Sequence, residues 1–198
     1  MRLRVLPILL GVAIAFGCGT EPGKTADLTG KKALMVIAKK GYRDEELNEP
    51  KAALEKSGVA VTLACSSLGT ATGMLGGTAS PTILVKDAKV ADYDAIVFVG
   101  GIGASEYFDD PTAHQIAREA AEGKLLCAIC IAPVTLARAG VLKGKKATVF
   151  SSKKGDLTKG GADYTGSAVE IDGNIITAEG PKAARRFANA IIDALSAR

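Results

Sequence analysis

Short apolar runs alternate with helical segments along most of this 198-residue chain. Continuous runs of Val, Ile and Leu are typical of strands buried on both faces, which occur in parallel sheets covered by helices. The sequence therefore predicts an α/β fold with a mostly parallel central sheet. The expected strands are 33–38, 59–64, 94–99, 125–129, 147–150, 168–171 and 175–178. The expected helices are 45–57, 111–122, 131–139 and 182–195, with a loop or small hairpin at 68–84.

The first residues have the pattern of an export signal. Two arginines in the first four residues precede an apolar stretch, 5–16, which is too short to span a bilayer comfortably. The segment AFGC that follows resembles a bacterial lipobox, in which Cys18 becomes the lipidated mature N-terminus. Its small residues also satisfy the rule for ordinary signal cleavage. We therefore expect anchoring through Cys18 to a membrane of a bacterial cell envelope. The expected divisions are a signal peptide at 1–17, a lipidated N-terminus and tether at 18–31, and one domain at 32–198.

Charge and cysteine content argue against several functions. The formal net charge is +4, and no basic cluster is interleaved with aromatic residues, so nucleic acid is not an expected partner. If Cys18 is acylated, Cys65, Cys127 and Cys130 remain, and an odd number in an exported protein indicates at least one free thiol. Cys127 and Cys130 have CxxC spacing, but Cys127 lies inside an expected strand, which disfavours a redox pair. No zinc site is expected, because His114 is the sole histidine.

The segment 125–133, LLCAICIAP, is the most informative motif for function. An expected strand ends at Cys130 among small residues, and a helix with proline in its first turn follows. This is the thiol version of a nucleophile elbow, a sharp turn that exposes one reactive side chain at a sheet edge. A helix N-terminus directed at the sulfur would favour the thiolate. The alternative is a buried structural cysteine in a core strand.

Two further groups are expected beside this cysteine, because the active site of such a sheet lies at the carboxyl ends of its strands. Gly100, Gly101 and Gly103 follow strand 94–99, and glycines there let backbone N–H groups face an anion. The segment 41–46 follows the first strand and brings carboxylates to the same edge. Both patterns also have simpler explanations, since α/β turns are often glycine-rich and helix N-termini favour acidic residues.

Together these residues resemble the DJ-1/PfpI family over residues 32–196. Four stretches carry the resemblance: ALMVIAKKGYRDEELNEP, DAIVFVGGIGA, AICIAP with the following LARAGVLKGKKAT, and DGNIITAEGP. The resemblance implies a flavodoxin-like three-layer sandwich that is usually dimeric, so a second copy of the chain is an expected partner. It also implies a reactive Cys130, a buried Glu46 hydrogen-bonded to it, and an oxyanion nest that includes Gly101, with Gly100 and Ile131 as neighbouring candidates.

Two positions depart from the family pattern. PfpI-type proteases and many glyoxalase-like members have a histidine directly after the cysteine, where this chain has Ile131. DJ-1-like members often have a histidine in the strand expected at 147–150, where this chain has Phe150. His114, in the first turn of the expected helix 111–122, is the only substitute base. The alternative for His114 is a histidine on the helix surface.

Glu46 is therefore expected to carry the proton chemistry, and burial beside a thiol would raise its pKa.

The first hypothesis is an enzyme that acts on small reactive carbonyls in the glyoxalase or deglycase manner. The second is a non-enzymatic protein that senses oxidation and stabilises a cysteine sulfinate. A third, a PfpI-like peptidase, is disfavoured by Ile131. We expect no cofactor and no metal. Tyr42 and Glu49 are candidates for shaping the pocket.

Overall fold

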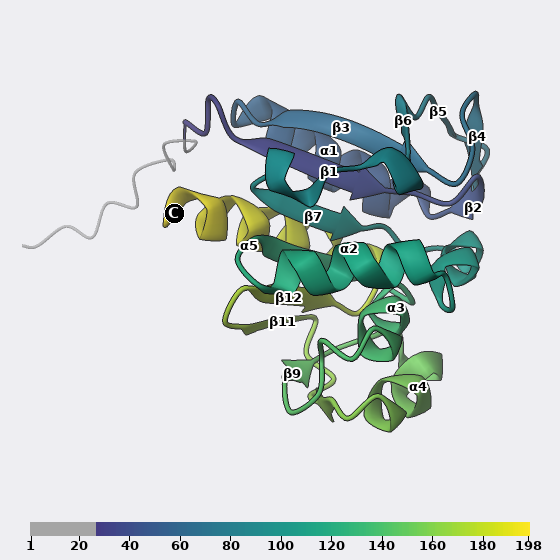
Figure 1. The fold of residues 1–198 in the computed structure, drawn as a ribbon, viewed down its shortest axis with the longest axis vertical. Helices are drawn as coiled ribbons and strands as arrows, with labels where there is room; N and C mark the ends of the chain where they lie inside the picture. The colour runs from purple at the N-terminus through teal and green to yellow at the C-terminus, as the bar shows by residue number, and fades with distance from the viewer. Residues whose placement is uncertain (1–26) are drawn as a thin grey trace, which may run out of the picture.

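A seven-stranded sheet forms the centre of the molecule (Figure 1), of which the computed structural model describes residues 27–198. From one edge to the other its strands are β11 (Val169–Asp172), β12 (Ile175–Ala178), β8 (Leu125–Ile129), β7 (Ala95–Phe98), β1 (Lys32–Val36), β3 (Ala60–Cys65) and β6 (Ile83–Leu84). All neighbouring strands are parallel except β11, which runs antiparallel to β12. The predicted mostly parallel sheet is confirmed.

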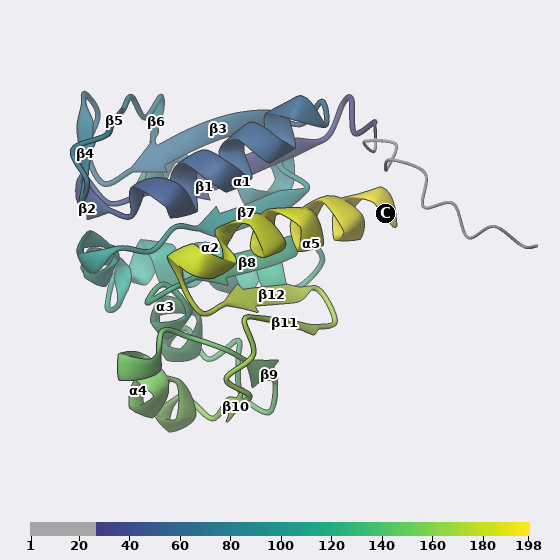
Figure 2. The same ribbon diagram turned by 180° about the vertical axis from the view of Figure 1, so that it is seen from behind.

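Helices cover both faces of this sheet. One face carries α1 (Asp44–Lys56) and α5 (Ala184–Ser196), which lie in front of the strands in Figure 2. The other face carries α2 (Pro111–Ala121) and α3 (Pro133–Arg138), as Figure 1 shows. The buried apolar residues divide into two clusters, one under each pair of helices. The fold is therefore the expected flavodoxin-like three-layer sandwich.

Short elements complete the described part of the chain. The segment 68–84 forms β4 (Ala71–Gly73), β5 (Thr78–Ala79) and the edge strand β6, and β4 also pairs with β2 (Lys40–Tyr42). A second small sheet joins β9 (Lys146–Ala147) to β10 (Asp163–Tyr164), with α4 (Lys154–Lys159) between them in the chain. The 3-10 helices are η1 (Val85–Asp87), η2 (Val90–Asp92), η3 (Ile102–Tyr107), η4 (Ser151–Lys153) and η5 (Pro181–Ala183).

The strand expected at 147–150 is wrong beyond Ala147. The Thr148 N–H donates to Thr177 Oγ1 at 2.9 Å, and the Phe150 N–H donates to the Cys130 carbonyl oxygen at 2.9 Å. These single bonds replace a strand ladder, because each goes to a different part of the main sheet. They fix Phe150 beside the end of β8, where it becomes part of the site.

The globular unit begins slightly before residue 32. Leu28 is buried, and its N–H donates to the Ser57 carbonyl oxygen at 2.7 Å. Leu28, which the sequence assigned to the tether, therefore packs against the domain. The expected signal peptide 1–17 and Cys18 lie outside the described residues. Within 27–198, no helix is both long enough and apolar enough to cross a membrane.

Candidate functional site

Cys130 lies at a strained turn directly after β8. Its φ of 63° is positive, which no other non-glycine residue in the described range shows. The Cys130 N–H donates to the Ala178 carbonyl oxygen at 2.9 Å, and its own carbonyl oxygen accepts from Phe150. These bonds from both sides hold a backbone conformation that costs about 1 kcal/mol or more in an L-residue. A strained thiol at the carboxyl end of a central strand is the elbow that the sequence predicted.

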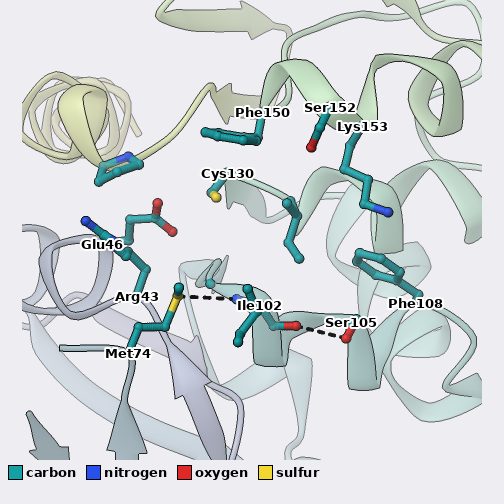
Figure 3. Close-up of a pocket in the computed structure, with 13 residues that line it drawn as sticks. Arg43, Glu46, Met74, Ile102, Ser105, Phe108, Cys130, Phe150, Ser152 and Lys153 are labelled. Atoms are coloured by element: carbon teal, nitrogen blue, oxygen red, sulfur yellow. Dashed lines mark hydrogen bonds between the residues drawn. The ribbon is translucent and has the colours of Figure 1, made fainter. Parts of the chain in front are cut away.

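The start of α1 lies against the glycine loop after β7. The Arg43 N–H, immediately before α1, donates to the Gly100 carbonyl oxygen at 2.9 Å. A side chain at Gly101 would overlap the backbone of Gly41 and Arg43, and its φ of 99° also favours glycine. This close approach brings Glu46, which is fully buried, next to Cys130 (Figure 3).

Gly100 lies between Glu46 and Cys130, where there is no room for a side chain. A Cβ at this position would overlap both Glu46 Oε2 and Cys130 Cβ. The Gly100 N–H faces the Glu46 carboxyl, whereas the N–H groups of Gly101 and Ile131 face the Cys130 sulfur. The three amides of the expected oxyanion nest therefore do not all face the sulfur, because the Gly100 N–H faces the Glu46 carboxyl instead.

Glu46 has the electrostatics of a buried acid. Burial raises the pKa of Glu46 to about 8, and the Cys130 thiol, the Arg43 guanidinium and the Gly100 N–H offset only part of that effect. Neither carboxyl oxygen has a hydrogen bond of ordinary length and angle among the described residues, so the nearby donors stabilise its ionised form weakly. Glu46 is therefore mostly protonated at neutral pH.

The Cys130 thiol does not become acidic. Burial, followed by the Glu46 carboxyl, raises the pKa of Cys130 to about 12, and the Gly101 and Ile131 N–H groups oppose this with smaller effects. The expectation that a helix N-terminus would favour the thiolate is wrong here. The following helix, α3, has only 6 residues and begins at Pro133, so its dipole does not overcome the loss of solvent. The thiol needs a base to react.

An open cavity of about 430 Å³, which we call the thiol cavity, lies in front of these groups (Figure 3). It is lined by the acid and the thiol together with Arg43, Met74, Gly101, Ile102, Ser105, Phe108, Ile131, Phe150, Ser152, Lys153 and Pro181. Cys130 lines this cavity and is 8% exposed. Its walls come from the segments that follow β2, β4, β7, β8, β9 and β12.

Most of the wall residues were missed by sequence reasoning. Met74 reaches the cavity because the carboxylate of Asp44 accepts the Leu75 and Gly77 N–H groups at 2.7 and 2.8 Å and so holds the turn after β4. Met74 Sδ then accepts the Ile102 N–H at 3.5 Å. No local pattern signals such a contact, because Asp44 and its partners lie more than thirty residues apart in the sequence.

His114 lies away from the thiol cavity. Its Nε2 is 2.8 Å from the Phe108 carbonyl oxygen, and its ring borders a separate hollow beside Arg138. Ile131 and Phe150, which stand where the resemblance implied a histidine, both line the thiol cavity. Because His114 is the single histidine of the chain, the lining of the thiol cavity contains no imidazole.

The remaining candidates have structural positions. Cys65 and Cys127 are fully buried, and all the cysteines that the structure describes are free. Tyr42 is buried in the core, and Glu49 lies 3.7 Å from Arg185, so neither lines the thiol cavity. Within residues 27–198, no three His, Cys, Asp or Glu side chains cluster in a way that would hold a metal ion.

Comparisons with known proteins agree with this architecture. The model of the DJ-1/PfpI family matches residues 31–194. An uncharacterized protein of Methanocaldococcus jannaschii is 40% identical over 198 residues, covering 98% of this chain and 97% of that protein. A deglycase of Pyrococcus horikoshii is 31% identical over 151 residues, covering 76% of this chain and 90% of that protein. The crystal structure of a ThiJ/PfpI domain protein from Brachyspira murdochii has a TM-score of 0.83 and 31% identity, covering 85% of this chain and 99% of that chain.

Proposed function

The chain belongs to the DJ-1/PfpI family, and from this premise we propose that it is a cysteine-dependent enzyme acting on small reactive carbonyls in the deglycase or glyoxalase manner. One observation carries the proposal. A strained thiol, Cys130, and a buried acid, Glu46, lie next to each other at the wall of an open cavity. The relative named as a deglycase supports the same class of reaction.

Glu46 supplies the base that the thiol lacks. With its pKa at about 8, about a tenth of Glu46 is ionised at pH 7. The ionised carboxylate accepts the Cys130 proton and leaves a thiolate beside a neutral carboxylic acid. The Gly101 and Ile131 N–H groups face the sulfur and stabilise this thiolate. The pair therefore titrates as a unit, in which a single proton moves between oxygen and sulfur.

The same proton completes the addition to a carbonyl. The thiolate attacks the carbonyl carbon, so that a carbon–sulfur bond forms and the carbonyl π electrons move to oxygen. The neutral Glu46 carboxyl then gives its proton to that oxygen, which yields a hemithioacetal and a carboxylate. This carboxylate is again able to accept a proton in the following step. One buried acid thus performs both the base and the acid roles without histidine.

Turnover of methylglyoxal by the purified full chain tests the proposal. We expect loss of methylglyoxal that stops when Cys130 is blocked by alkylation before the assay. If the folded protein consumes no methylglyoxal, and mild peroxide converts Cys130 to a stable sulfinate, the chain is a sensor rather than an enzyme. Peptide mass spectrometry of Cys130 measures that second outcome directly.

Two features outside the site complete the proposal. We propose that Cys18 carries the lipid that anchors the protein in a bacterial cell envelope, as the leader pattern indicates. Mass spectrometry of the membrane fraction should find a diacylglyceryl group at Cys18, and an unmodified Cys18 in a soluble product would contradict this.

We also propose a homodimer, which sedimentation of the purified protein would detect as twice the chain mass.

A further inference from the structure

Two of the four ionisable side chains that line the thiol cavity are cationic. Arg43 and Lys153 contribute positive charge, while the only carboxyl in the lining is Glu46, which is mostly protonated at neutral pH. The carboxylates that pair with the two cations, Glu45 and Asp156, lie outside the lining. The cavity therefore presents positive charge to a molecule that enters it.

Arg43 and Lys153 differ in how many of their hydrogen-bond donors are already used by neighbouring carboxylates. The Arg43 guanidinium donates two hydrogen bonds to Glu45, at 2.8 and 2.9 Å, so its planar fork is already occupied. Lys153 Nζ lies 3.6 Å from Asp156 Oδ2, and Asp156 is shared with Arg138 at 3.4 Å. An ammonium group has three donors and rotates freely. Lys153 therefore keeps donors for a ligand.

Lys153 and the acid lie on opposite sides of the thiol. Figure 3 shows Glu46 on one side of Cys130 and the end of Lys153 on the other, beside Phe108. The Lys153 Nζ is 5.5 Å from the centre of the Phe108 ring. The apolar side chain of Ile131 lies in the lining as well. A molecule whose carbonyl carbon meets the sulfur would extend over apolar surface toward the ammonium group.

We propose that the thiol cavity selects small oxo compounds that carry a carboxylate remote from the reacting carbonyl, and that Lys153 binds this carboxylate. The claim that such compounds are turned over rests on the proposed function. The claim that the cavity favours anionic molecules at the Cys130 sulfur depends only on the cavity, and reagents that alkylate the thiol without catalysis can test it.

Iodoacetate and iodoacetamide form a suitable pair of probes, because they have similar size and differ by one negative charge. In both reactions the Cys130 sulfur forms a bond to carbon, iodide leaves with the bonding electrons, and the thiol proton goes to solvent. The measured quantity is the ratio of the two rate constants at Cys130, iodoacetate over iodoacetamide, obtained by peptide mass spectrometry. The same ratio at Cys130 in urea-unfolded protein gives the intrinsic preference of the reagents.

We expect the ratio in the folded full chain to exceed the unfolded ratio about five- to tenfold, as one partly screened positive charge in the same cavity would produce. Lys153→Gln should remove most of this excess, and Lys153→Arg should restore it. Lys154→Gln is the matched control, because the Lys154 ammonium lies 5.2 Å from the Tyr164 ring and does not line the cavity. This control should keep the full excess.

Equal ratios in the wild-type protein and Lys153→Gln would overturn the inference. If Lys153→Gln fails to fold, the wild-type protein can be tested at high salt instead. About 0.5 M salt should screen the positive charge and lower the iodoacetate over iodoacetamide ratio to its value in the unfolded protein. Turnover measurements distinguish this inference from the proposed function. The anionic oxo substrate is 4,5-dioxopentanoate, and the neutral one is methylglyoxal. If the protein turns over neither substrate but still reacts preferentially with iodoacetate, the proposed function is wrong and the inference about the cavity stands.

Discussion

Cys127 and Cys130 lie three residues apart on one polypeptide segment, yet they differ in backbone geometry and in access to the thiol cavity. Cys127 is inside β8, has regular strand geometry and is fully buried. Cys130 follows the strand, has a φ of 63° and lines the thiol cavity. Burial raises the pKa of both thiols, so burial does not distinguish them. What distinguishes Cys130 is access and a proton partner.

The proton partner matters more than the backbone amides in this comparison. The Gly101 and Ile131 N–H groups lower the pKa of Cys130, but burial outweighs them. In the proposed mechanism Glu46, whose pKa is about 8, accepts the thiol proton in the same buried space. The strained turn would then place the sulfur at the cavity, and the acid would supply the base. The predictions below remove these differences between the two cysteines one at a time.

The largest effect should come from exchanging the nucleophile. Cys130→Ser should reduce methylglyoxal turnover by at least about 10³-fold, because a serine hydroxyl beside a weak base is a poor nucleophile. Cys127→Ser is the matched control and should retain turnover in the folded protein. Steady-state kinetics on both variants measures the contrast. Equal losses in the two variants would mean that the strand end has no special role.

Removal of the proton partner should have the next largest effect. Glu46→Gln keeps the size of the side chain but cannot exchange a proton, so turnover should fall about 10²-fold. Glu49→Gln, on the same helix but outside the thiol cavity, is the control. If Glu46→Gln has full turnover and the two variants melt alike, the proposed proton transfer is wrong. If the protein is a sensor, Glu46→Gln should instead change how readily Cys130 stops at the sulfinate under mild peroxide.

The spacing between acid and thiol should have a smaller but measurable effect. Gly100→Ala places a methyl group where Glu46 Oε2 and Cys130 Cβ lie, so the two groups must separate. We expect roughly tenfold lower turnover and a loss of about 1–3 kcal/mol in the free energy of unfolding. Gly123→Ala is the control, because a Cβ there meets open space. Unchanged turnover in Gly100→Ala would show that close contact between acid and thiol is unnecessary.

The sequence predicted the parts of the molecule whose pattern is local. Continuous apolar runs identified β1, β3, β7 and β8 because those strands are buried on both faces. The elbow was predicted because Cys130 directly follows such a strand. Glu46 was singled out by the resemblance to the DJ-1/PfpI family, since the sequence pattern itself indicated only that segment 41–46 brings carboxylates to the same sheet edge.

The parts that sequence reasoning missed depend on contacts between distant segments. Phe150 was placed in a strand, but its backbone bonds to Cys130 rather than to a strand neighbour. Lys153 enters the cavity wall from a 3-10 helix that no periodic pattern indicates. The acidity of Cys130 was overestimated for a related reason. A helix start in the sequence does not show how deeply the sulfur in front of it is buried.

The smallest expected effect is a shift in the pH dependence of Cys130 alkylation. In the wild-type protein the Glu46–Cys130 pair loses its first proton near the pKa of about 8, so labelling by iodoacetamide should rise with a midpoint there. In Glu46→Gln no carboxylate accepts the proton. Removing the Glu46 carboxyl takes away the second cause that raises the pKa of Cys130, but burial, the first cause, still keeps that pKa above its ordinary value of 9.0. The midpoint of labelling should therefore move upward by about one pH unit or more. Cys127 serves as the internal control, because it has neither access nor a partner at any of these pH values. An unchanged midpoint in Glu46→Gln would mean that the thiol titrates alone, and that Cys130 differs from Cys127 only by its exposure to the cavity.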